Sequence, residues 1–90
     1  MRHLHKVEGR GTLSAPGYPA LTVEFYYDVF DSETMLDMRG RIISDDFQTL
    51  SVWFHNLVKL TLKTDTFSLQ FSLSDEDGHF RATERPTVLE

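Results

Sequence analysis

The chain has 90 residues, of which 40% are apolar, a net charge of −5 and no cysteine. This length suits one domain with one compact core, and the apolar content argues against disorder. The absence of cysteine excludes a disulfide framework, a thiol nucleophile and a thiolate metal site. The acidic balance disfavours nucleic acid as a partner, because phosphate contacts need a basic surface.

The chain has no apolar run near the ~18 residues that a membrane span needs. Its opening residues, MRHLHKVEGRG, also lack the apolar segment of a secretory signal. Secreted domains of this size usually carry disulfides. We therefore expect a cytoplasmic protein without a membrane partner.

The start of the chain is rich in side chains that carry or can carry positive charge: Arg2, His3, His5, Lys6 and Arg10. Such a start forms either a small anion-binding patch or the solvated end of a strand, and we favour the strand end. His3 and His5 also form an H-x-H pair, which can hold a metal when a third ligand lies near. Nothing in the sequence places another histidine beside them, so we predict no metal site.

Three strands are predicted in the first half of the chain, over residues 4–13, 21–30 and 35–43. Each alternates between apolar and polar residues, which is typical of a half-buried strand. The connecting segments SAPGYPA and DSET are rich in turn formers or polar residues and have hairpin length. These features predict a three-stranded antiparallel meander.

The register of the first pair follows from placing Leu13 opposite Leu21. Gly9 then lies beside Phe25, and the second pair places Gly40 on the other side of the same ring. A large aromatic side chain can compensate for glycine in a strand. A bulge or bend at the glycines is the alternative interpretation.

Placing Phe30 opposite Met35 in the second pair brings Asp28 to face Asp37. Paired carboxylates can share a proton and perform acid–base chemistry. In the first pair, however, Lys6 lies opposite Asp28, so we expect it to neutralise both carboxylates on an exposed face. The chain also lacks a nucleophile elbow, a phosphate-binding loop and a dinucleotide fingerprint. We therefore predict no catalytic residue, no enzymatic activity and no cofactor.

The link SDDFQTLSVWFHN breaks the alternation of the strands. Three of its apolar residues are spaced three and four apart: Phe47, Leu50 and Phe54. Asp45 with Gln48 resembles a capping box, so we predict a short helix over residues 45–54. An irregular strand is the alternative, because Val, Trp and Phe favour sheets.

Alternation resumes in the second half of the chain, which predicts strands over residues 57–63, 67–73 and 79–84. Placing Leu62 opposite Phe67 aligns the first two of these strands. The turn SDEDG places carboxylates before Gly78, as a calcium loop does, but it lacks the twelve-residue frame and the terminal Glu. We interpret it as a hairpin turn in which glycine supplies a positive φ.

The predicted fold is therefore mainly β, with two three-stranded antiparallel meanders joined by one short helix in the order β-β-β-α-β-β-β. Each meander has one apolar face that must be covered. The two sheets can cover each other as a small sandwich or an open barrel, with the helix at one end. Alternatively, a second copy of the chain covers one sheet face.

Four residues outside the predicted core form a candidate interface: Tyr18, Tyr26, Arg39 and Trp53. Exposed aromatic side chains and arginine are enriched at protein interfaces. In the alternative interpretation, Trp53 caps the rim of the core and Tyr26 only covers Arg39. We predict a non-enzymatic protein-interaction module that binds a protein partner or itself, as a homodimer that buries Trp53 and Tyr26 or their neighbours. A carrier of a small apolar ligand between the two sheets is the alternative function.

Overall fold

The structure is a computed structural model that describes residues 2–31, 36–83 and 85–88. Its strands form a closed six-stranded antiparallel barrel with an extra strand, which confirms the predicted mainly β fold with one short helix. Met35 and Glu84, which were expected at the ends of two strands, lie outside the described residues.

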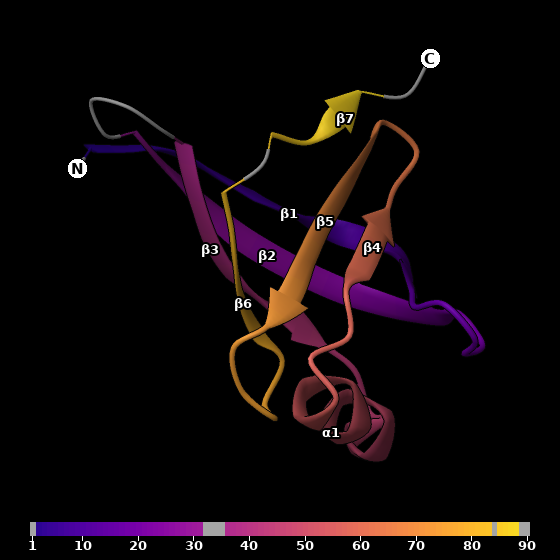
Figure 1. Cartoon of the computed structure of the whole chain (residues 1–90). Helices are drawn as coiled ribbons and strands as arrows, with labels where there is room; N and C mark the ends of the chain where they lie inside the picture. The colour runs from indigo at the N-terminus through magenta and orange to yellow at the C-terminus, as the bar shows by residue number, and fades with distance from the viewer. Residues whose placement is uncertain (1, 32–35, 84, 89–90) are drawn as a thin grey trace.

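The first meander follows the predicted strands closely and consists of β1 (Arg2–Ser14), β2 (Leu21–Asp31) and β3 (Leu36–Ile43) (Figure 1). The pairing of β1 with β2 confirms the predicted register, with Leu13 opposite Leu21 and Gly9 opposite Phe25. A register shift lies between His3 and His5, near the start of β1. Apolar alternation and cross-strand charge therefore predicted this hairpin correctly.

The predicted alignment of β2 with β3 is wrong by two residues. Gly40 lies opposite Tyr27 rather than Phe25. A shift of two keeps every side chain on its expected face, so apolar alternation fits both alignments equally well. Close contact favours the observed one, because a Cβ atom on Gly40 would lie 2.0 Å from the Tyr26 carbonyl oxygen and 2.5 Å from Tyr27 Cβ. Only glycine fits at this crossing of the two strands.

Helix α1 (Phe47–His55) lies in the predicted link, but it starts two residues later than expected. Asp46 rather than Asp45 is the N-cap, and its carboxylate accepts hydrogen bonds from the N–H and the hydroxyl of Thr49. The helix buries Leu50 and Trp53, whereas Phe47 is 63% exposed. The buried face is therefore rotated away from the apolar stripe that the spacing predicted.

The second meander consists of β4 (Leu60–Lys63), β5 (Phe67–Leu73) and β6 (His79–Ala82). Leu62 lies opposite Leu69, so the predicted partner Phe67 is again wrong by two residues. The turn explains this difference. The Thr64 N–H donates to the Phe67 carbonyl at 2.8 Å, and the Phe67 N–H donates to the Thr64 hydroxyl at 3.1 Å. Thr64 thus closes a shorter turn than the predicted one.

The two meanders join along both sides and close into a barrel. β1 pairs with β4 and β3 pairs with β6, which gives the ring order β4-β1-β2-β3-β6-β5. A strand that the sequence did not predict, β7 (Thr87–Val88), pairs with the start of β5. The sequence predicts either a sandwich or an open barrel. The pairings of β1 with β4 and of β3 with β6 show that the barrel is closed.

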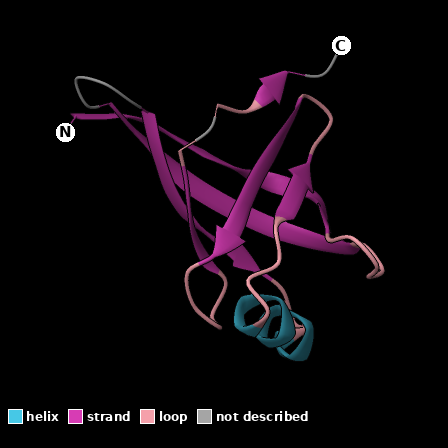
Figure 2. Ribbon diagram, viewed as in Figure 1, coloured by secondary structure: helices cyan, strands magenta, loops and turns pink. Residues whose placement is uncertain are grey.

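The core lies inside the barrel and continues to its end, where α1 packs (Figure 2). Rings of four aromatic residues contact one another within the core: Phe25, Tyr27, Phe71 and Phe80. Side chains from both meanders thus occupy the space in which the alternative prediction placed an apolar ligand.

Candidate functional site

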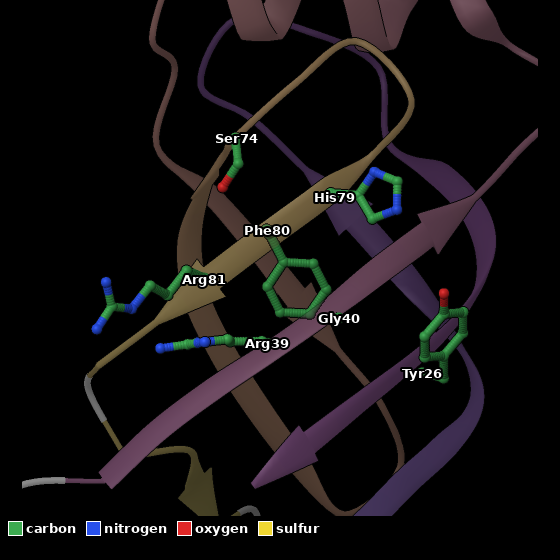
Figure 3. Close-up of a pocket in the computed structure, with 7 residues that line it drawn as sticks. All are labelled: Tyr26, Arg39, Gly40, Ser74, His79, Phe80 and Arg81. Atoms are coloured by element: carbon green, nitrogen blue, oxygen red, sulfur yellow. The ribbon is translucent and has the colours of Figure 1, made fainter. Parts of the chain in front are cut away.

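A groove of about 400 Å³ lies on the outer face of the barrel, where β2, β3 and β6 run side by side. We call it the cationic groove, and Figure 3 shows the seven residues that line it. They are Tyr26 from β2, Arg39 and Gly40 from β3, Ser74 from the turn before β6, and His79, Phe80 and Arg81 from β6. The groove therefore combines cationic, aromatic and polar side chains from separate parts of the chain.

Two arginines are directly opposite each other in this groove. Arg39 on β3 pairs in register with Arg81 on β6, and their side chains extend in the same direction in Figure 3. Both contact the carboxylate of Asp37, which is only 1% exposed. Arg39 donates from Nε to Oδ2 at 3.0 Å, and Arg81 donates from Nε to Oδ1 at 2.9 Å. One buried carboxylate thus holds two guanidinium groups.

The charge state of Asp37 follows from these contacts. Burial alone would raise the pKa of the Asp37 carboxyl, but hydrogen bonds from Arg81 and Arg39 outweigh burial and hold the pKa below its usual range. Asp37 is therefore ionised at neutral pH. Since it supplies one negative charge to two positive ones, the group keeps a net positive charge. The arginine side chains are about half exposed, at 50% and 53%, so this charge is accessible.

Further polar contacts organise the opposite side of the groove. His79 Nδ1 lies 2.8 Å from Asp75 Oδ2, which orients the imidazole ring. Arg41 lies opposite His79 in the β3–β6 pair and donates to the Asp77 carbonyl at 3.1 Å. The outer face of β3 and β6 therefore places Arg39 opposite Arg81 and Arg41 opposite His79, at two successive outward positions.

The structure separates the four residues of the predicted interface. Tyr26 and Arg39 line the cationic groove, although Tyr26 lies opposite Arg41 and not Arg39. Tyr18 is 41% exposed and its ring meets that of Trp53 edge-on, with centroids 5.9 Å apart.

The placement of Trp53 on a surface is wrong. Its side chain is fully buried, and its indole N–H has no hydrogen-bond partner within the described part of the chain. The end of the barrel needs a large apolar side chain to close it, and α1 turns Trp53 inward. A dimer interface that buries Trp53 is therefore excluded for the folded chain.

The predicted carboxylate pair is also wrong. Asp28 lies opposite Arg39, and its carboxylate contacts His3 Nε2 at 3.0 Å. Lys6 lies opposite Asp28 as expected, but its ammonium group is 3.9 Å from the Glu8 carboxylate and lies over the Tyr26 ring. Because β3 is displaced by two residues, Asp37 moves away from Asp28 and binds the arginine pair.

Metal-ligating side chains come together at one position among the described residues. The ligand atoms of Asp75, Asp77 and His79 lie within 4.8 Å of one another, on the turn between β5 and β6. Asp75 Oδ1 also accepts from the N–H groups of Asp77 and His79, and Gly78 has a φ of +96°. These contacts build the predicted hairpin turn, and they account for the position of the carboxylate without a metal.

His79 and Arg81 are not among the site residues that the sequence predicts. The pairing of β3 with β6 joins residues about 40 positions apart, and no local pattern indicates it. A usable signal was present in the alternation of HFRA, which places His79 and Arg81 on the outer face together. These two residues form a site only together with Arg39 and Gly40 of β3, which lies next to β6.

A scan against models of protein families and searches of curated proteins and solved structures found no match to this chain. In the part of the chain that the structure describes, no helix is long and apolar enough to cross a membrane.

Proposed function

We propose that this protein is a non-enzymatic protein-interaction module whose cationic groove binds an acidic peptide segment of a partner protein. The observation that carries the proposal is the direct cross-strand pair of Arg39 and Arg81. Like charges directly opposite each other destabilise a sheet. Asp37 compensates one of the two charges, and an anionic group of the partner would compensate the other.

The chemistry of the groove supports an acidic peptide. Guanidinium groups bind carboxylates through paired hydrogen bonds, and arginine and tyrosine are enriched among the residues that dominate binding energy. The half-exposed Arg39 and Arg81 share the groove with the partly exposed ring of Tyr26, so the groove offers both charge and an aromatic surface. Asp37 acts as a positioning residue, because its buried carboxylate fixes the direction of both guanidinium groups.

A nucleic acid fits the chain less well than an acidic peptide. The whole chain carries a net charge of −5, which opposes any anion, but it opposes a phosphate backbone with a charge at every nucleotide more strongly than a peptide with a few carboxylates. The carrier of an apolar ligand is also disfavoured, because side chains of both meanders occupy the space between them.

The experiment is an NMR titration of the ¹⁵N-labelled chain with an amidated peptide of alternating glutamate and leucine. We expect shifts that cluster at Arg39, Gly40, His79 and Arg81. Arg81→Gln removes one groove charge and should weaken binding by about tenfold, which is the loss typical of an interface residue worth about 1.4 kcal/mol. Lys63→Glu changes an exposed residue of β4 outside the groove and serves as the control.

A second variant guards against a folding defect, because Arg81→Gln also removes a contact of Asp37. Tyr26→Ala leaves that contact intact and should likewise weaken binding. Shifts that spread over the surface, or groove variants that bind as tightly as the parent, would overturn the proposal. Equal binding of a single-stranded oligonucleotide at the same residues would reassign the groove to nucleic acid.

A cytoplasmic location is part of this proposal. It is supported by the composition, because a chain without cysteine gains no disulfide from an oxidising compartment. Fractionation of cells that express the tagged chain tests it, and recovery outside the cytoplasm would contradict it.

A further inference from the structure

The strand β1 has a long edge that no strand among the described residues covers. Along one side, β1 pairs with β2 from Arg2 to Leu13. Along its other side it pairs with β4 only over Thr12–Ser14. Figure 1 shows β1 running well past β4 toward the N-terminus. Backbone N–H and C=O groups along such an edge are a template for another strand.

A hollow of about 310 Å³ lies beside this edge. It is bounded by residues 7–10 of β1 and by residues 64–67 at the turn between β4 and β5, with Phe25 at its base. The side chains of this part of β1 are mostly exposed. A strand from another molecule therefore has room to approach the backbone of β1 at residues 7–10, and residues 5 and 6 have no strand partner on this side among the described residues.

We propose that two copies of the chain pair through this edge, antiparallel and about a two-fold axis at Val7. In this register Lys6 of each copy faces Glu8 of the other, and His5 faces Gly9. With this axis, every residue of one copy pairs with a residue of the other copy whose side chain points to the same face of the sheet. The paired β1 strands therefore form one continuous sheet across the two barrels.

Charge selects this register over its neighbours. An axis at Lys6 would set Lys6 against its own copy and Arg2 against Arg10. An axis at Glu8 would set Glu8 against its own copy and Lys6 against Arg10. An axis at Gly9 would set Glu8 against Arg10 but extend the ladder to Gly11, where a Cβ atom would already lie 2.7 Å from the Lys63 carbonyl oxygen. An axis at His5 would set Arg2 against Glu8, but its ladder would run through the register shift between His3 and His5. The axis at Val7 places opposite charges beside the axis and avoids both regions.

The ladder over residues 5–9 is short, so the contact buries less than the ~1,200 Å² of a standard stable interface. We therefore expect a weak dimer with a dissociation constant on the order of 100 μM. The exposed ion pairs also imply that added salt weakens the dimer.

Sedimentation equilibrium of the full chain at concentrations up to about 1 mM tests the proposal through charge exchange. Lys6→Glu and Glu8→Lys each place like charges across the axis and should weaken dimerisation by about tenfold, which corresponds to about 1.4 kcal/mol. The double variant K6E/E8K restores opposite pairs and should recover the affinity of the parent. Arg85→Glu reverses an exposed charge outside β1 and should leave the affinity unchanged.

Lys6 also lies 3.9 Å from Glu8 of its own chain, so the double variant restores this local pair as well. Circular dichroism and thermal denaturation therefore check that each single variant is as stable as the parent, so that the loss and recovery of affinity report the contact between copies. A parent that stays monomeric at about 1 mM would overturn the proposal. A dimer that both single variants leave unchanged would also overturn it, because pairing would then lie elsewhere.

Discussion

Gly9 and Gly40 differ in how much space their backbone leaves for a side chain. A Cβ atom on Gly9 would lie 3.7 Å from the nearest atom of the Phe25 ring, which is an ordinary contact. A Cβ atom on Gly40 would lie 2.0 Å from the Tyr26 carbonyl oxygen, where no side chain fits. The alternation of residues predicts both glycines as partners of Phe25, but only Gly9 has that role.

These contacts predict opposite results for two alanine substitutions. Gly40→Ala should lower the free energy of unfolding by about 3 kcal/mol, because the new methyl group must push two strands apart. Gly9→Ala should cost nothing measurable, since its Cβ fits and alanine restricts the unfolded chain. Thermal denaturation of the two variants measures the difference. Equal melting temperatures would show that the observed pairing of β2 with β3 is wrong.

At the scale of elements, the end of α1 explains where the next strand begins. The N–H groups of Leu57 and Val58 donate to the carbonyls of Phe54 and Trp53, and Leu57 has a φ of +52°. This arrangement is a Schellman motif with leucine at the position that usually holds glycine. Residues 57–59 were predicted to be strand, but this cap occupies the chain as far as Val58, and β4 begins at Leu60.

The cap predicts a stabilising substitution. Leu57 is 75% exposed, so its side chain contributes little packing, whereas its left-handed backbone is strained. Leu57→Gly should therefore raise the free energy of unfolding by about 0.5–1 kcal/mol, which corresponds to about 4 °C in melting temperature. Leu57→Ala keeps the Cβ atom and serves as the control. A gain as large for alanine as for glycine would contradict the backbone explanation.

For the whole molecule, closure of the barrel depends on a few residues where three strands meet. Leu13 is fully buried and lies opposite Leu21 on β2 and Leu62 on β4. Leu4 lies on the same strand but is 41% exposed, beyond the stretch that β4 covers. Leu13 thus lies in the part of β1 that β4 covers, and Leu4 lies in the part where this edge has no strand partner among the described residues.

This difference predicts that Leu13→Ala lowers the free energy of unfolding by about 2–5 kcal/mol, a large fraction of the stability of a small domain. Leu4→Ala should change it by less than about 0.5 kcal/mol. Urea denaturation followed by circular dichroism measures both values. If the two variants lose similar stability, the junction of β1, β2 and β4 does not close the barrel.

The cationic groove also depends on the whole molecule, because its residues come from strands that are far apart in the sequence. Tyr26 and Arg39 were predicted to be interface residues from their residue types and their outward positions. Their partners His79 and Arg81 come from a strand about 40 residues further along the chain. The buried charge of Asp37 was not predictable either, because alternation placed it on an outer face, and its contacts with Arg39 and Arg81 depend on the pairing of β3 with β6.

The sequence by itself determined the strands, their inward and outward faces, and the register of β1 with β2. These features depend on alternation and on charge pairs between neighbouring strands, such as Arg10 with Glu24 at 3.2 Å. The tertiary structure decided the other two hairpin registers, the closure of the barrel, the burial of Trp53 and the meeting of Arg39 with Arg81. Alternation repeats every two residues, so it cannot distinguish alignments two residues apart, whereas the close contact at Gly40 can.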